Sequence, residues 1–125
     1  MRYLGVDFGL RRIGLAISEG ELASPWQIIE VSSFSDAIEK TSKIINENSF
    51  EEIIIGLPEG QIGKKAAKFA AALRKQGFEV KSADETLSSK KALAELIEQG
   101  AGQKKRRFKD AFSAAEILQN YLDSM

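Results

Sequence analysis

Four acidic residues, at three places in this 125-residue chain, stand where carboxylates could act together in catalysis. Asp7 interrupts the apolar, strand-like run from Tyr3 to Ser18, and the alternation of a strand places it on the face opposite to Val6. We expect Asp7 to lie midway along the central strand of a sheet. An unpaired charge there is costly, so this position predicts a cation or metal that meets the carboxylate.

The other three acidic residues lie at the ends of expected elements. Asp84 and Glu85 follow an expected parallel strand, and the carboxyl edge of such strands is where ligands bind in open α/β sheets. Asp110 falls in the first turn of the expected last helix. A carboxylate is also favoured at any helix N-terminus, so Asp84 or Glu85 could act only as a cap. Together, however, these acids could hold hard divalent cations through oxygen ligands.

The composition excludes several alternative chemistries. The chain has no histidine and no cysteine, which removes Ser-His and Cys-His nucleophilic catalysis, zinc sites of ordinary composition and disulfides. Eighteen basic residues balance 18 acidic ones, so any attraction to nucleic acid must come from local clustering. No apolar run approaches the roughly 18 to 20 residues of a membrane span, and the start of the chain lacks a signal-peptide pattern. We therefore expect one domain over residues 1–125, a cytoplasmic location and no membrane partner.

Local clusters of basic residues accompany the acids. Arg11 and Arg12 lie in an expected hairpin close to Asp7, and a second basic cluster immediately precedes Asp110. A run of charge is usually only a solvated surface, but this placement favours contacts to nucleic-acid phosphates. We expect the segment 100–107 to be the least ordered internal part of the chain. The second cluster comprises Lys104, Lys105, Arg106, Arg107 and Lys109.

Hydrophobic periodicity predicts five strands and four helices. Ser33 or Ser35 could cap the first helix, Gly77 ends the second, and uninterrupted Ile53 to Ile55 are typical of a strand buried on both faces. The order βββαβαβαα predicts an α/β fold with a mixed five-stranded sheet flanked by helices. The strands are expected within 2–9, 12–20, 25–33, 51–58 and 78–84, and the helices within 33–48, 64–77, 86–100 and 108–125.

Four segments together resemble the RuvX/YqgF family. These proteins are predicted Holliday junction resolvases of the RNase H-like superfamily and are also described as nucleases of the 5′ end of precursor 16S rRNA. The matching segments are "GVDFGLRRIGLAIS" (5–18), "EEIIIGLPEG" (51–60), "DETLSS" (84–89) and "KDAFSAAEILQNYL" (109–122), in family order and spacing. The resemblance implies an RNase H-like fold, in agreement with the order of elements.

The resemblance also implies a set of site residues and a chemistry. The catalytic acids would be Asp7, Glu85 and Asp110, with Glu85 favoured over Asp84 as the second acid, and all four carboxylates would be candidate ligands of two Mg²⁺ or Mn²⁺ ions. The implied reaction is hydrolysis of phosphodiester bonds in pre-16S rRNA or branched DNA, by a monomer or a homodimer. Thr86 and Ser113 depart from the usual pattern of such enzymes. A non-catalytic RNA-binding role in ribosome maturation is the alternative.

Overall fold

The computed structural model describes residues 1–84 and 109–125, with the side chain of Asp84 left out. The predicted helix at 86–100 and the basic residues 104–107 lie outside these residues. The described elements are strands β1 (Tyr3–Asp7), β2 (Arg12–Ser18), β3 (Ser24–Glu30), β4 (Glu52–Leu57) and β5 (Val80–Asp84), and helices α1 (Phe34–Asn48), α2 (Gln61–Lys75) and α5 (Lys109–Asp123).

The five described strands form one mixed sheet, as predicted, and the structure places them in the order β3-β2-β1-β4-β5. Strands β1 to β3 are an antiparallel meander, whereas β4 pairs in parallel with both β1 and β5. Strand β1 is therefore central, and the carboxyl ends of β1, β4 and β5 lie at the same edge of the sheet. One expectation was wrong: Asp7 is the last residue of β1 rather than its middle, because the chain leaves the sheet there to form the hairpin to β2.

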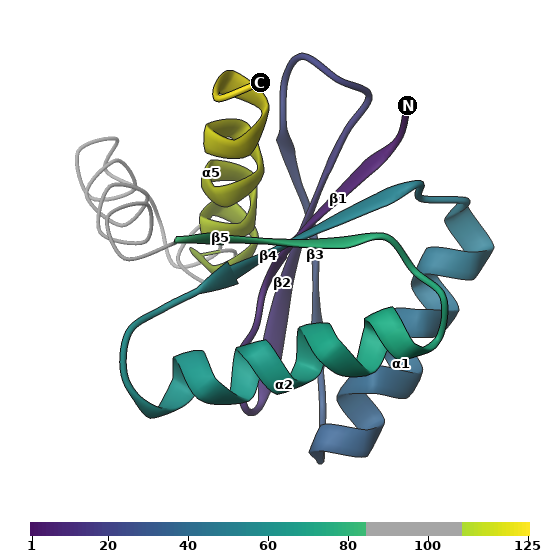
Figure 1. Ribbon diagram of the computed structural model, residues 1–125, viewed down its shortest axis with the longest axis vertical. Coiled ribbons are helices and arrows are strands. Elements are labelled where there is room, and N and C mark those ends of the chain that lie inside the picture. The colour runs from purple at the N-terminus through teal and green to yellow at the C-terminus, as the bar shows by residue number, and fades with distance from the viewer. Residues whose placement is uncertain (85–108) are drawn as a thin grey trace.

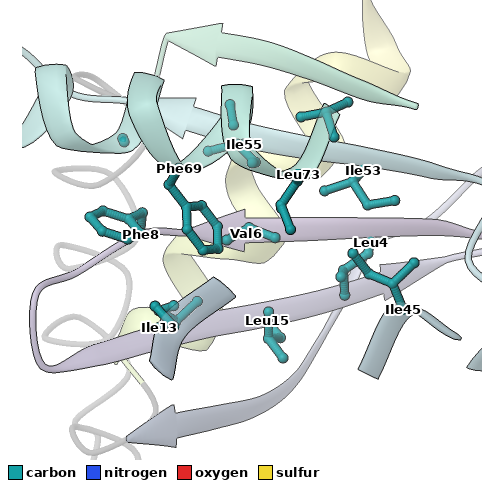
Figure 2. Packing of buried hydrophobic residues seen from close by; sticks show 14 of the residues in the cluster. Leu4, Val6, Phe8, Ile13, Leu15, Ile45, Ile53, Ile55, Phe69 and Leu73 are labelled. Carbon is teal, nitrogen blue, oxygen red and sulfur yellow. The ribbon is translucent and has the colours of Figure 1, made fainter. Parts of the chain in front are cut away.

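Helices cover the two faces of the sheet unequally (Figure 1). Helices α1 and α2 pack on one face and α5 packs across the other. The strand β4 shows why: Ile53 and Ile55 point into the core under α1 and α2, whereas Ile54 points into the cluster under α5. The larger core surrounds Phe69 and Leu73 of α2, as Figure 2 shows. The expectation that β4 is buried on both faces is confirmed.

Local signals account for the helix ends. Ser33 caps α1, since its hydroxyl accepts a hydrogen bond from the Asp36 N–H at 3.0 Å. Gly77 has a φ of 97° just beyond α2, so a residue that tolerates the left-handed region stops that helix. Helix α2 begins at Gln61, earlier than predicted, because its first turn contains the weak helix former Gly63 and the apolar periodicity becomes recognisable only later.

A polar contact ties α5 to the sheet. The Tyr121 hydroxyl donates to Glu52 Oε1 at 2.5 Å, and Lys81 Nζ lies 3.6 Å from the same oxygen. Glu52 is only 9% exposed, so these two partners offset much of the cost of burying its carboxylate. The hydrogen bond to Glu52 and burial raise the pKa of Tyr121 above its ordinary value.

Candidate active site

The candidate site begins at Asp7, where β1 ends. Leu4, Val6 and Phe8 belong to the core under α1 and α2, while Tyr3 packs in the cluster under α5. Because side chains alternate along a strand, Asp7 shares the face of Tyr3 and is directed to the α5 side. It is half-buried at that end of the strand.

Two glycines bring the backbone of α5 close to the sheet on this side. A Cβ atom on Gly14 would lie 2.0 Å from the backbone oxygen of Asp110, and a Cβ atom on Gly5 would lie 2.8 Å from the backbone oxygen of Ala114. Real side chains do not fit at such distances, so glycine at both positions permits this approach. Gly14 is also the Cα partner of Asp7 in the β1–β2 ladder. The first turn of α5 is thereby held beside the end of β1.

Asp110 lies in that first turn and forms an ion pair with an arginine of β2. Arg12 Nε is 3.5 Å from Asp110 Oδ2, with the arginine side chain 54% exposed and the aspartate side chain 20% exposed. Arg12 opens β2, on the far side of the hairpin that follows Asp7. The structure therefore gathers two of the predicted acids and one of the predicted phosphate-binding residues at one end of one face of the sheet.

The remaining predicted residues are distributed around this point or lie outside the described residues. Arg11 is exposed in the hairpin, where its carbonyl oxygen accepts a hydrogen bond from the Val31 N–H at 2.9 Å, and Lys109 is exposed at the start of α5. Asp84 ends β5, and its backbone pairs with Leu57 at the same edge of the sheet. Glu85 and the basic residues 104–107 fall outside the described residues.

Gly5 and Gly14 position α5 but were not predicted as functional from the sequence. Both stand inside strand patterns, and a glycine there weakens the strand unless a neighbouring backbone must approach closely. That signal was available in the segment "GVDFGLRRIG". The sequence does not tell which element approaches these glycines, because α5 lies at the other end of the chain.

The donor set suits a hard divalent cation. Asp7 and Asp110 supply carboxylate oxygens, the ligands that Mg²⁺ and Mn²⁺ prefer. Within the described part of the chain, no group of three or more acidic, histidine or cysteine residues could hold a metal ion. The side chains of the other two predicted ligands, Asp84 and Glu85, are not described.

A model of a known family matches nearly the whole chain. It is described as "RuvX: Holliday junction resolvase" and covers residues 1–124. This chain belongs to the RuvX family.

Curated relatives match the chain over nearly its whole length. The chain is 38% identical to the "Putative pre-16S rRNA nuclease" of Halothermothrix orenii, over 98% of this chain and 95% of the relative. It is 33% identical to the protein of the same name from Desulforamulus reducens, over 99% and 98% of the two chains.

Two solved structures share the RuvX chain's fold. The first is the fowlpox virus resolvase in complex with Holliday junction DNA, with a TM-score of 0.69 and 12% identity over 99% of this chain and 98% of that chain. The second is Thermus thermophilus RuvC in complex with a Holliday junction, with a TM-score of 0.65 and 15% identity over 99% of this chain and 95% of that chain. The predicted RNase H-like fold is confirmed. No helix among the described residues of this RuvX member is long and apolar enough to cross a membrane.

Proposed function

We propose that this protein is a divalent-metal-dependent endonuclease that hydrolyses phosphodiester bonds in structured nucleic acid. The observation that carries the proposal is the position of α5, which sets Asp110 over Gly14, the sheet partner of Asp7. Two aspartates far apart in the sequence thus lie at the same end of the sheet. Relatives named for pre-16S rRNA cleavage and a family named for Holliday junction resolution define the two substrates to be compared.

Each residue has a distinct part in this proposal. Asp7, Asp110 and Glu85, with Asp84 as the neighbouring candidate, would hold Mg²⁺ or Mn²⁺. Such ions, when bound, make water a better nucleophile and neutralise charge that develops on the phosphate. Arg11, Arg12 and Lys109 are placed to contact phosphates next to the cleaved bond, which positions the substrate without reading its sequence.

The substrate determines the assembly that is required. Symmetric cleavage of a four-way junction needs two active sites and hence a homodimer, whereas trimming one rRNA end needs a single site. We propose a cytoplasmic location, in keeping with an rRNA precursor or chromosomal DNA as substrate.

Cleavage assays with matched variants test the proposal. The full chain is incubated with an end-labelled pre-16S rRNA fragment and with a labelled four-way DNA junction, in Mg²⁺, in Mn²⁺ and in EDTA. We expect metal-dependent cleavage that falls at least about a hundred-fold in Asp7→Asn, because a metal-binding carboxylate is lost. Asp123→Asn, an exposed position at the end of α5, is the matched control and should cleave like the parent.

The outcome also decides the alternative role. If the parent binds RNA but cleaves neither substrate with either metal, a non-catalytic RNA-binding role replaces the proposal. If Asp7→Asn cleaves at the parental rate, the nuclease site lies elsewhere.

A further inference from the structure

A pocket of about 360 Å³ opens on the α1–α2 face of the sheet, beyond the end of β1. Its lining includes the buried ring of Phe8, the partly exposed ring of Phe34, and Lys65 and Lys68 from α2. The volume lies in the range of roughly 300 to 1,000 Å³ that is usual for sites of small organic groups. This pocket takes no part in the carboxylate site described above.

The aromatic side of the pocket has the form of a stacking platform. The Phe34 ring lies edge-on to Phe8 and to Phe69, with both centroid distances 6.4 Å. Phe8 and Phe69 are themselves 4.8 Å apart and lie side by side in Figure 2. Phe34 is held by these contacts yet remains 41% exposed. A rigid aromatic ring with a free surface suits a nucleobase, since every base has a face that can stack.

The charged side of the pocket carries two lysines. Lys65 and Lys68 are exposed, and neither forms an ion pair with a described residue. No acidic residue is among the described residues that line the pocket. Two ammonium groups that form no ion pair with a described residue, beside an apolar surface, fit a base with its phosphates better than they fit an apolar peptide.

The pocket and the carboxylate site lie on opposite faces of the sheet, on either side of the β1–β2 hairpin. Phe8 follows Asp7 directly, so the two side chains lie on opposite faces of the same strand end. Within the hairpin, Leu10 lines the pocket and Arg12 contacts Asp110. A nucleic-acid strand that passes around this end of the sheet can therefore reach both places.

We propose that this pocket binds an unpaired base of the substrate strand close to the cleaved phosphate, with Phe34 as the stacking surface and Lys65 and Lys68 as phosphate contacts. The proposal rests on the proposed nuclease function and narrows its substrate class to nucleic acid with a single-stranded segment beside the cleavage position. A fully paired duplex would first have to unpair and unstack a base before that base could enter the pocket, which costs free energy.

Binding measurements in a cleavage-deficient background test this proposal. The probe is an RNA hairpin with a single-stranded tail that carries 2-aminopurine, and the comparison is the same hairpin without the tail. In Asp7→Asn protein with EDTA, we expect Phe34→Ala to weaken binding of the tailed hairpin at least about five-fold and to abolish the change in 2-aminopurine fluorescence. Binding of the blunt hairpin should be unchanged, and Phe34→Tyr should restore both signals.

The lysines are tested by salt dependence. Lys65→Gln/Lys68→Gln should flatten the salt dependence for the tailed hairpin because fewer counterions are released. The control variant Lys43→Gln/Lys75→Gln has the same net charge as Lys65→Gln/Lys68→Gln, but it alters exposed lysines outside the described lining of the pocket. It should therefore keep the parental slope of log affinity against log salt.

Failure of the pocket proposal is distinguishable from failure of the nuclease proposal. If Phe34→Ala melts at the parental temperature and binds the tailed hairpin as the parent does, the pocket holds no base, whatever the cleavage assays show. The same conclusion follows if the 2-aminopurine signal survives Phe34→Ala. If binding depends on Phe34 but the parent cleaves nothing, the pocket stands and only the nuclease function fails.

Discussion

The backbone oxygen of Asp110 lies directly over Gly14, at 2.0 Å from where a Cβ atom of residue 14 would be. This contact joins the first turn of the last helix to the strand that pairs with Asp7. The geometry of the candidate site therefore requires residue 14 to have no side chain.

Gly14→Ala should displace α5 and disable the site. The added methyl group meets backbone atoms, which cannot rotate away, so we expect a loss of about 3 kcal/mol in the free energy of unfolding and a large loss of cleavage. Gly20→Ala is a useful control because no atom lies within 4 Å of its Cβ position, although its φ of 127° disfavours alanine. It should lose about 1 kcal/mol and keep cleavage. Urea denaturation and cleavage assays check both, and equal activity of the two variants would contradict this account.

Arg12→Ala should strengthen the binding of Mn²⁺ in the absence of nucleic acid. The guanidinium of Arg12 faces the Asp110 carboxylate, so a metal ion must compete with it. Because the pair is partly exposed, the expected gain is modest, about two- to five-fold in Kd by calorimetric titration. Arg11→Ala removes an equal charge from the same hairpin and should leave the Mn²⁺ affinity unchanged. A gain of the same size in both variants would show a general charge effect and not this ion pair.

Tyr121→Phe should destabilise the fold in a manner that depends on pH. The variant loses the hydrogen bond to Glu52, which is worth about 1 kcal/mol, while Lys81 keeps its contact with that carboxylate. The pKa of Tyr121 is raised above its ordinary value of 10.0, chiefly by the hydrogen bond to Glu52. Its contribution is therefore complete below pH 10 and is lost as the pH rises through the folded-state pKa. Denaturation at several pH values should show parent and variant converging above pH 10, and a constant difference would contradict the assignment.

Replacing Lys104, Lys105, Arg106 and Arg107 together with Ala should weaken nucleic-acid binding and leave the melting temperature nearly unchanged. These residues lie outside the described part of the chain, so this prediction rests on their place in the sequence beside Asp110. The slope of log affinity against log salt should fall by about 0.7 to 0.9 for each phosphate contact that is lost. Titrations at several salt concentrations measure it. An unchanged slope would mean that the run is only a solvated surface and that Arg11, Arg12 and the pair Lys64 and Lys65 hold the phosphates.

Much of the fold and the membership in the RuvX family follow from the sequence alone. The run of Ile53 to Ile55 predicts a strand buried on both faces, and the change from alternation to helical periodicity predicts the order of elements. The start of the first helix was predicted at Ser33 or Ser35, and the structure selects Ser33. These features can be predicted because backbone conformation and burial depend largely on residues that are neighbours in the chain. Asp7 was identified in the same way, as a charge within an apolar strand.

The tertiary structure alone decided how those residues meet. That Arg12 contacts Asp110, that Tyr121 reaches the buried Glu52, and that Phe34 forms one wall of a pocket next to Lys65 could not be read from their spacing. Such contacts join residues far apart in the chain, and they depend on how closely α5 and α1 approach the sheet. The approach of α5 is set by the absence of side chains at Gly5 and Gly14, whose effect becomes visible only when the packed helix is in place.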